Sequence, residues 1–361
     1  MKRARIVVGA NYGDEGKGTV VAHYTKNATG SVLNILTNGG AQRGHSILTE
    51  DGSITFQHFG SGTYHGADSY YSRFFILNPM QFVQEYESLI VKPAKIYRDW
   101  HCRWSTPYDI MANLITEHAR GRHASCGMGI WNTVKRTREQ GWYSFDQFLS
   151  SETAPIYLEK VKLYYEKLIS VPEDWKPIWN SPILKAHFLN DCRFLAEHTE
   201  VVGFTGGDSL ATLDYDNLIF ENGQGLLLCD EGKDVPDRTP SNTGLLYSLE
   251  LLKGVPDVDV AAHYVTRPYL TRHGDGHILN QSSRSKLSNH VEEDRTNHFN
   301  DYQGEFRYGV LDLHDLQQRI LKDSRGVKTE LEVTHCDEVD RVAEFTKTFT
   351  TVHTYDSALI R

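Results

Sequence analysis

Short apolar runs that end in glycine open the chain and predict buried strands. Residues 6–8 are Ile-Val-Val and are closed by Gly9, and a second run over residues 31–37 is again followed by glycines. Continuous apolar runs of this length are typical of parallel strands that are covered on both faces. Residues 19–26, between the two runs, can form a helix. This order of strand, glycine loop, helix and strand predicts the beginning of an α/β sheet.

The pattern changes to helical spacing in the middle of the chain and returns to strands near its end. Apolar residues recur at helical spacing over residues 79–89, 107–119, 154–169 and 184–198. Strand signals return at residues 217–220, 257–265 and 330–339. The sequence therefore predicts one domain over residues 1–361. In it, we expect a P-loop-like, mostly parallel central sheet, built from both ends of the chain and flanked by helices, with a helical insertion at about residues 80–200.

The composition narrows the class of protein. Of the 361 residues, 39% are hydrophobic and 24% are charged, which is typical of a globular protein. The formal net charge of -9 argues against duplex nucleic acid as a partner. No apolar run is long enough to span a membrane, so we expect no membrane partner. The cysteines are scattered and form no C-x-x-C pair, which argues against a disulfide framework or structural zinc and favours the cytoplasm.

The loop after the first strand reads GANYGDEGKGT over residues 9–19. Its backbone amides, the start of the next helix and Lys17 together favour an anion such as a nucleotide phosphate. Gly18 follows the lysine where the common phosphate loop has serine or threonine, and the loop also carries two carboxylates. Asp14 beside a phosphate can bind Mg²⁺ or act as a general base. On loop composition alone, a solvated surface turn is the alternative.

This loop and several later segments resemble, in the same order, the motifs of the adenylosuccinate synthetase family. The loop matches G-x-x-x-G-D-E-G-K-G, and the later segments are residues 38–46, 125–130, 220–228, 239–243, 264–276, 308–313 and 333–340. Members of this family join L-aspartate to C6 of a purine nucleoside monophosphate with hydrolysis of a nucleoside triphosphate. The resemblance implies a carbon–nitrogen ligase that works through a 6-phosphoryl intermediate.

The resemblance also implies a role for each matching residue. Asp14 would take the N1 proton of the purine, His45 would help to transfer the γ-phosphoryl group to O6, and Gln224 would hydrogen-bond near the 6-position. Asp14 and the carbonyl of Gly44 would bind Mg²⁺. The implied triphosphate-binding positions are Gly13, Glu15, Gly16, Lys17, Gly18, His335 and Asp337. The implied purine monophosphate-binding positions are Gln42, Ser125, Cys126, Arg138, Gln224, Thr239 and His273, although Thr239 can equally belong to an ordinary turn.

Some positions for the other substrates depart from the family pattern. Cys126 replaces a threonine of the phosphate segment, so monophosphate binding must rely on amides, serine and arginines. A run of arginines in the aspartate-binding loop is reduced to Arg307, to which Gln303 could add a polar contact. Family members also take an arginine from a dimer partner. The resemblance therefore implies a homodimer, with Arg136 or Arg138 as a candidate for that arginine.

The segment expected to bind the triphosphate base and the compact length of the chain resemble the viral branch of the family. His335 replaces a lysine, whereas Asp337, which accepts hydrogen bonds from guanine in the family, is retained, so GTP is favoured and ATP stays open. Viral members act on GMP or dGMP and make 2-amino-(deoxy)adenylosuccinate for 2-aminoadenine (Z) DNA, which for a bacteriophage protein implies the host cytoplasm. Asp14 is retained, although some viral members have a small residue there. The alternatives are an ordinary synthetase that uses IMP and GTP and, in another class, a nucleotide-binding switch without ligase activity.

Overall fold

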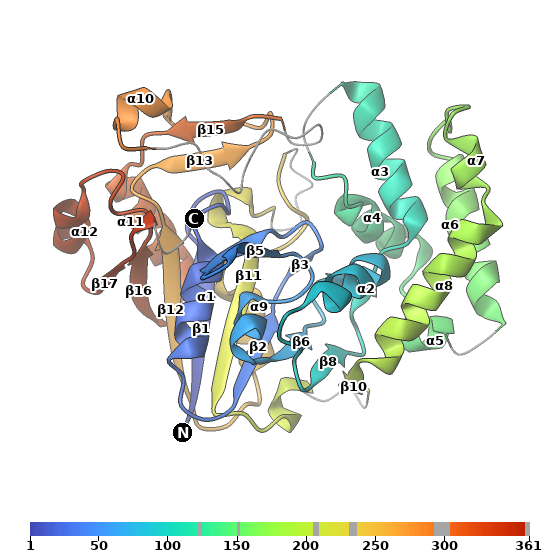
Figure 1. Ribbon diagram of the computed structural model, residues 1–361, viewed down its shortest axis with the longest axis horizontal. Coiled ribbons are helices and arrows are strands. Elements are labelled where there is room, and N and C mark those ends of the chain that lie inside the picture. Colours follow the sequence, from blue (N-terminus) through green and yellow to red (C-terminus); the bar gives the residue numbers. More distant parts are fainter. Residues whose placement is uncertain (122–124, 150–151, 205–208, 231–236, 292–303, 358–361) are drawn as a thin grey trace.

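The computed structural model contains one central sheet of nine strands (Figure 1). The strands are β1 (Lys2–Gly9), β2 (Val32–Leu36), β6 (Asp68–Tyr71), β8 (Ile96–Asp99), β10 (Glu200–Val202), β11 (Asn217–Gly225), β12 (Val258–Thr266), β16 (Lys328–Val333) and β17 (Val352–Thr354). Their order is β10-β8-β6-β2-β11-β1-β12-β16-β17, and every neighbouring pair is parallel. The structure describes residues 1–121, 125–149, 152–204, 209–230, 237–291 and 304–357. The expected α/β class with a parallel central sheet is confirmed.

Both faces of this sheet are covered, which explains the continuous apolar runs of its strands. Val7 of β1 packs with Val20 on one face. Ile6 and Val8 point to the opposite face, because side chains alternate along a strand, and belong to a larger core that includes Leu316. The helices that follow the central strands are α1 (Lys17–Lys26), α9 (Leu245–Leu252), α11 (Leu313–Ser324) and α12 (Val342–Thr348).

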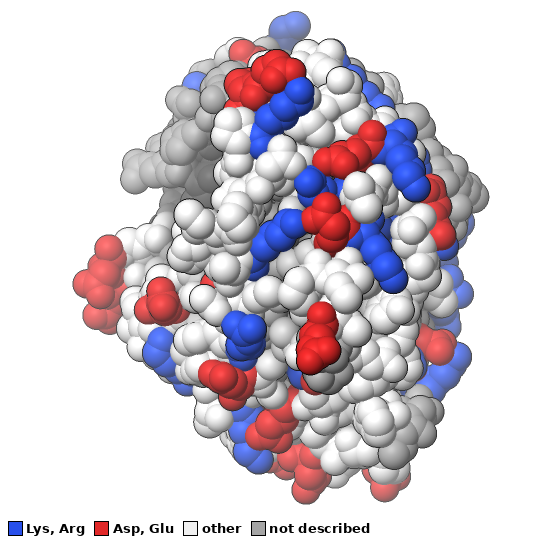
Figure 2. Space-filling model, turned by 90° about the vertical axis from the view of Figure 1, so that its right-hand side faces the viewer, with Lys and Arg blue, Asp and Glu red and all other residues white. Residues whose placement is uncertain are grey.

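Most of the chain between β7 (Phe75–Leu77) and β10 forms helices that pack beside the sheet (right-hand side of Figure 1). They are α2 (Pro79–Ser88), α3 (Pro107–Arg120), α4 (Ile130–Gln140), α5 (Phe145–Leu149), α6 (Thr153–Glu166), α7 (Lys176–Trp179) and α8 (Pro182–Glu197). A second core holds them together and includes Trp104, Tyr108 and Phe188. Figure 2 shows this side of the molecule, where basic and acidic side chains are interspersed. Within the described ranges, no helix combines the length and the apolar character needed to cross a membrane.

The same helical segment also extends the sheet, which differs from the expectation of a sheet built from the two ends of the chain. β8 and β10 lie at one edge of it. The apolar pattern misses β8 because two of its four buried side chains, Arg98 and Asp99, are charged and find partners elsewhere. Arg98 donates two 2.5 Å hydrogen bonds to Asp146, and Asp99 accepts from Tyr70 at 3.2 Å and from Ser209 at 2.6 Å.

Smaller sheets surround the central one. One contains β3 (Gly39–Gly40), β7 (Phe75–Leu77) and β9 (Arg103–Trp104), one is the hairpin of β4 (His45–Thr49) and β5 (Gly52–Phe56), and one contains β13 (Leu270–His273), β14 (Gln281–Ser282) and β15 (Phe306–Gly309). The remaining helix is α10 (Arg284–Leu287), and short 3-10 helices occupy Ser61–His65, Ser209–Thr212 and Leu226–Leu228. β3 follows β2 and β13 follows β12, so two of these sheets adjoin the carboxyl ends of central strands. Open parallel sheets bind their ligands at that edge.

Candidate active site

The glycine loop connects β1 to α1 and is held by side chains from distant parts of the chain. Arg267 donates from Nε to the carbonyl of Asp14 at 2.7 Å, and Thr334 donates from Oγ1 to the carbonyl of Glu15 at 2.7 Å. Gly16 ends the loop in the left-handed conformation, with a φ of 91°. The ends of β12 and β16 thus fix the loop where it enters the helix.

Inside the loop, Glu15 and Lys17 form a buried ion pair. Lys17 Nζ lies 3.6 Å from Glu15 Oε2 and donates to the carbonyl of Gly13 at 2.7 Å. Glu15 Oε1 accepts from the backbone amides of Asn11 at 3.0 Å and Gly13 at 2.8 Å. Burial raises the pKa of Glu15 and lowers the pKa of Lys17, and in each case the charge of the partner opposes the shift. A carboxylate of the chain itself therefore occupies amides that could bind a phosphate.

Close backbone contacts bring two further segments to this loop. A Cβ on Gly13 would lie 3.0 Å from the Cα of Gln224, and a Cβ on Gly18 would lie 2.6 Å from the carbonyl oxygen of Ser46. Both positions therefore need glycine. Gln224 lies near the end of β11 and has a φ of 57°, and His45 opens β4 directly before Ser46. The structure thus brings the predicted catalytic positions of three separate motifs to one edge of the sheet.

His45 belongs to a buried cluster with Glu221 and Arg43. His45 Nδ1 lies 2.5 Å from Glu221 Oε1, and an Arg43 nitrogen lies 3.3 Å from the same oxygen. Burial works against the charge of Glu221, but Arg43 and His45 outweigh it and lower the pKa of Glu221 to about 2. Burial, followed by the charge of Arg43, lowers the pKa of His45 to about 4. Near neutral pH, His45 is therefore uncharged, its Nδ1 proton is donated to Glu221, and Nε2 is an acceptor.

Several buried polar atoms at this end of the sheet have no hydrogen-bond partner. Buried polar atoms usually have a partner, so those without one point to a missing ligand or water. Among the described residues, such atoms occur at the site on Glu15, Gln42, Arg43, Gln224, Arg272, His273 and Arg307. They include both ring nitrogens of His273, on β13.

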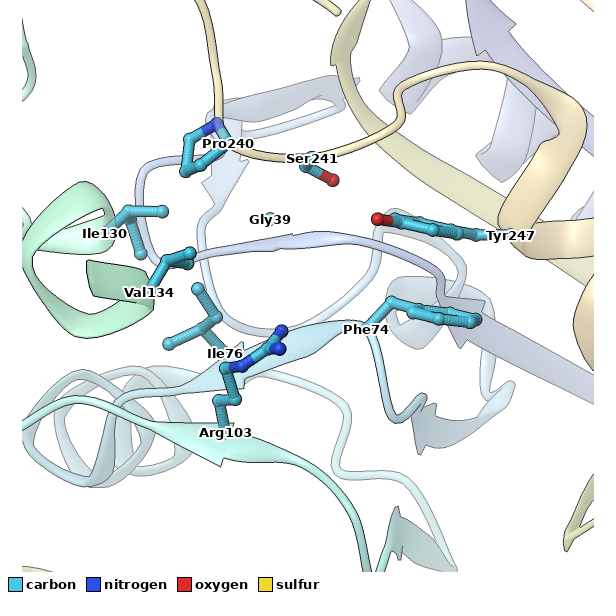
Figure 3. Close-up of a pocket in the computed structure, with 9 residues that line it drawn as sticks. All are labelled: Gly39, Phe74, Ile76, Arg103, Ile130, Val134, Pro240, Ser241 and Tyr247. Atoms are coloured by element: carbon cyan, nitrogen blue, oxygen red, sulfur yellow. The ribbon is translucent and has the colours of Figure 1, made fainter. Parts of the chain in front are cut away.

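None of the predicted monophosphate-binding residues lines the pocket of Figure 3, whose lining is Gly39, Phe74, Ile76, Arg103, Ile130, Val134, Pro240, Ser241 and Tyr247. Ser125 accepts from the amide of Asn113 at 3.1 Å, and burial raises the pKa of Cys126 to about 11, so this thiol is neutral at physiological pH. Thr239 is buried and directly precedes two residues that line the pocket, whereas Arg138 is exposed on α4. The pocket therefore lies between the start of α4 and the chain around residue 240.

The predicted triphosphate-base residues follow β16. His335 is buried, has a φ of 54°, and its Nδ1 lies 3.0 Å from Thr334 Oγ1. Asp337 is exposed, and its carboxylate accepts from the backbone amide of Ser357 at 2.5 Å and from the Ser357 hydroxyl. Ser357 thus fixes the orientation of the Asp337 carboxylate.

The predicted aspartate-binding arginine lies on β15, where Arg307 pairs with Arg272 of β13. Arg307 donates to the carbonyls of Gly274 and Gly276 in the turn after β13. Its Nε is buried without a partner. Gln303, the other predicted aspartate ligand, lies outside the described residues. The antiparallel strands β13 and β15 therefore carry two neighbouring arginines.

Comparison with known proteins identifies the family. The family model of adenylosuccinate synthetase matches residues 6–350. The chain belongs to this family. Adenylosuccinate synthetase of Borrelia duttonii is 25% identical over 326 residues, which cover 87% of this chain and 73% of that protein. The enzyme of Nitrosomonas europaea is 25% identical over 287 residues, which cover 76% of this chain and 64% of that protein. The chain is a carbon–nitrogen ligase of the adenylosuccinate synthetase type, which joins aspartate to a purine nucleotide.

Solved structures share the fold of this family member. Adenylosuccinate synthetase of Plasmodium falciparum has a TM-score of 0.71 at 20% identity and covers 93% of this chain and 77% of its own. Succinoaminodeoxyadenylate synthetase of cyanophage S-2L, bound to dGMP and dATP, has a TM-score of 0.68 at 14% identity. That match covers 99% of this chain and 92% of the cyanophage chain. At these identities the likeness establishes the fold.

Several residues support the site of this adenylosuccinate synthetase homologue rather than line it, and their roles were not predicted from the sequence. Glu221 orients His45, Arg267 holds the loop, and Arg272 lies over the ring of Tyr12 at 5.0 Å. Glu221 had a detectable signal, because an acid directly after the apolar run 218–220 has to be buried and paired. Arg267 and Arg272 lie in the matched segment 264–276, but partners such as the carbonyl of Asp14 and the ring of Tyr12 are far away in the sequence and could not be predicted from it.

Proposed function

We propose that this adenylosuccinate synthetase homologue joins L-aspartate to C6 of GMP or dGMP, with hydrolysis of ATP or GTP. The product would be 2-amino-(deoxy)adenylosuccinate, a precursor of 2-aminoadenine for phage DNA. The observation that carries the proposal is the meeting of a phosphate-binding loop, His45 and Gln224 at one edge of the sheet, among buried polar atoms without partners. We further propose that the enzyme is a homodimer in the cytoplasm of the host.

The side chains at this edge fit the two stages of the reaction. Asp14, half-buried in the loop, takes the N1 proton, and the negative charge that develops on O6 lets this oxygen attack the γ-phosphorus of the triphosphate. The nucleoside diphosphate leaves. The amine of L-aspartate then attacks C6, loses a proton and displaces the phosphate from that carbon. Lys17 and the loop amides stabilise the negative charge in the first stage.

His45 and Gln224 act on the 6-position. A phosphoryl group beside Nε2 raises the pKa of His45, because its negative charge favours the imidazolium form. Nε2 then donates to the oxygen that is being phosphorylated, while Glu221 holds Nδ1. Gln224 brings an amide to the same region, and its Oε1 is buried without a donor.

The site also fits Mg²⁺. Asp14 supplies a carboxylate in the loop, and Gly44, exposed directly before His45, supplies a backbone carbonyl. Both are oxygen donors of the kind that this hard cation prefers. When bound, Mg²⁺ would offset the negative charge of the phosphates.

Two buried amide oxygens support guanine as the acceptor base. A Cβ on Gly39 would lie 3.3 Å from Gln224 Oε1 and 3.4 Å from Gln42 Nε2, so the two amides border the same glycine. Oε1 of each is buried without a donor. Because Asp14 takes the N1 proton, the donor that remains for these oxygens is the 2-amino group, which guanine has and hypoxanthine lacks. The near-complete overlap with the cyanophage enzyme, which was bound to dGMP, also supports this choice.

IMP with GTP is the second candidate. The observation that favours it is Asp337, whose carboxylate is exposed and oriented by Ser357 at the position that accepts hydrogen bonds from guanine in the family. With this pair of substrates, the enzyme would be an ordinary adenylosuccinate synthetase.

One assay separates these readings. The protein is incubated with L-aspartate, Mg²⁺ and either ATP or GTP, and IMP, GMP and dGMP are offered separately. Mass spectrometry of the products identifies the acceptor. We expect a succinylated product from GMP or dGMP; a product from IMP alone would show that the second candidate is correct. Fast triphosphate hydrolysis without aspartate, and no succinylated product, would favour a nucleotide-binding switch.

A further inference from the structure

The orientation of Asp14 depends in part on a hydrogen bond from outside the glycine loop. Asp14 and the residue after it lie between Gly13 and Gly16, whose φ values are 112° and 91°. Residues with a side chain rarely adopt such angles, and glycine leaves the backbone on either side more conformational freedom. The Nε of Arg267 donates to the carbonyl of Asp14 at 2.7 Å. The position of Arg267 therefore limits how the peptide that carries Asp14 can turn.

A buried tyrosine in turn fixes Arg267, which directly follows β12. The Nη1 of Arg267 donates to the hydroxyl of Tyr269 at 3.3 Å. The guanidinium carbon lies 5.9 Å from the ring centroid of Tyr269 and 5.8 Å from that of Phe306. The Tyr269 hydroxyl donates its own proton to Oε2 of Glu338. This hydroxyl therefore has an acceptor and a donor role that are both occupied, which favours one orientation of the tyrosine and of the arginine.

Arg267, Tyr269 and Glu338, which we call the arginine network, are all buried. Hydrogen bonds that involve charged groups are strong, and the small amount of water in a buried site strengthens them further. Burial also raises the pKa of Tyr269. The hydroxyl therefore keeps its proton at physiological pH and stays a donor.

The arginine network ends in the segment that is expected to bind the base of the triphosphate. Glu338 directly follows Asp337. In the same segment, Thr334 donates from Oγ1 to the carbonyl of Glu15 at 2.7 Å. Residues 334–338 therefore reach two successive carbonyls of the loop, that of Glu15 directly and that of the residue before it through the network.

We propose that Tyr269 and Glu338 are positioning residues of this ligase, which act through Arg267 to hold Asp14 in the orientation that it needs to take the N1 proton. The inference rests on the proposed function for the role of Asp14. A displacement of about 1 Å of a reacting group can lower a rate by about 100-fold, so a hydroxyl away from the substrate can affect kcat. Because Tyr269 is not among the residues expected to contact a substrate, its loss should change kcat more than KM.

Steady-state kinetics of the full chain test this proposal, with the acceptor and the triphosphate that the ligase assay identifies. Tyr269→Phe removes the hydroxyl and keeps the ring. The matched control is Tyr215→Phe, because Tyr215 is also buried and its hydroxyl donates to Asp68 at 2.7 Å. Tyr215 lies two residues before β11, at the opposite edge of the central sheet from the glycine loop. Thermal unfolding establishes that each variant is folded.

We expect Tyr269→Phe to lower kcat by about 10- to 100-fold and to leave the KM of each substrate within about two-fold of wild type. Tyr215→Phe should behave like wild type. Arg267→Lys should also lower kcat, because an ammonium lacks the planar fork that binds Asp14 and Tyr269 together, and it provides the test if Tyr269→Phe does not fold. An unchanged kcat, or a rise in KM alone, would overturn the inference while the proposed function stands.

A double variant separates positioning of Asp14 from a general effect on the structure. If Tyr269 acts through Asp14, Tyr269→Phe should change kcat by no more than about two-fold in a protein that already carries Asp14→Asn. Losses that multiply would show that Tyr269 acts independently of Asp14, and would overturn the inference alone. A wild-type kcat of Asp14→Asn would overturn the proposed base and the inference together.

Discussion

The glycine loop and the antiparallel pair of β13 and β15 hold their charged groups in opposite ways. In the loop, arginines from elsewhere hold the backbone: Arg267 binds the carbonyl of Asp14, and Arg319 binds the carbonyl of Ala10 at 3.2 Å. On β15, Arg307 itself donates to the backbone carbonyls of Gly274 and Gly276, in the turn after β13. The loop is thus fixed around the carboxylate that we propose as the base, whereas Arg307 would have to exchange its backbone partners for a substrate carboxylate. We therefore expect a change of Asp14 to affect mainly kcat and a change of Arg307 to affect mainly the KM for its substrate.

The largest expected effect comes from Asp14→Asn, which keeps the shape of the loop and removes the proposed base. We expect kcat to fall by about 10²- to 10⁴-fold, with monophosphate binding retained. The matched control is Asp51→Asn, which changes an exposed acid in the turn between β4 and β5 and should leave kcat unchanged. Steady-state kinetics measure both variants. Equal activity of Asp14→Asn and wild type would remove the reason to regard the loop as the reactive region.

Glu221→Gln tests whether the buried cluster of His45, Glu221 and Arg43 stabilises the region around the loop. The change leaves the charge of Arg43 buried without its carboxylate, so we expect the free energy of unfolding to fall by about 3–5 kcal/mol. Urea denaturation provides the measurement. Glu250→Gln, which loses an exposed pair with Lys253, should change it by about 1 kcal/mol or less. A similar small change in both variants would contradict the structural role of Glu221.

Arg307→Gln tests whether the strand pair of β13 and β15 binds a substrate carboxylate. If Arg307 binds the substrate carboxylate, the KM for L-aspartate should rise by about 10- to 100-fold, because a charged hydrogen bond is lost. The KM for both nucleotides should stay close to wild type. Lys286→Gln, at an exposed cation of α10, is the matched control. A fall in kcat with an unchanged KM for aspartate would show that Arg307 contributes to the chemical step, as proposed for the loop, and would contradict the difference between the two regions.

The smallest expected effect is a change in the pH dependence of stability. The pKa of His45 is about 4 in the folded protein, against an ordinary value of 6.5. Between these values the unfolded chain binds a proton that the folded chain does not, so His45 makes stability fall as pH falls from 6.5 toward 4.

His45→Gln should remove that contribution. Urea denaturation at several pH values in this window should show a slope that is smaller by up to about 1.4 kcal/mol per pH unit. His58, whose pKa burial lowers to about 3, stays in place and provides the same kind of dependence in both proteins. Parallel curves for wild type and variant would contradict the lowered pKa of His45.

The sequence predicted the central strands and the glycine loop because their signals are local. The run at residues 6–8 is apolar because both faces of β1 are covered, and the glycines of the loop are needed where Gln224 and Ser46 approach. β8 could not be predicted, because its burial depends on partners such as Asp146 that are far away in the sequence.

The backbone at Gln224 has a consequence for how this protein can change. A side-chain-bearing residue with a φ of 57° lies in a conformation that disfavours any Cβ, by about 1 kcal/mol. Glycine would relax the chain there but would have no amide to offer to a purine. Selection for stability therefore favours glycine at this position, whereas selection for turnover favours glutamine. A variant selected here for thermostability should lose activity.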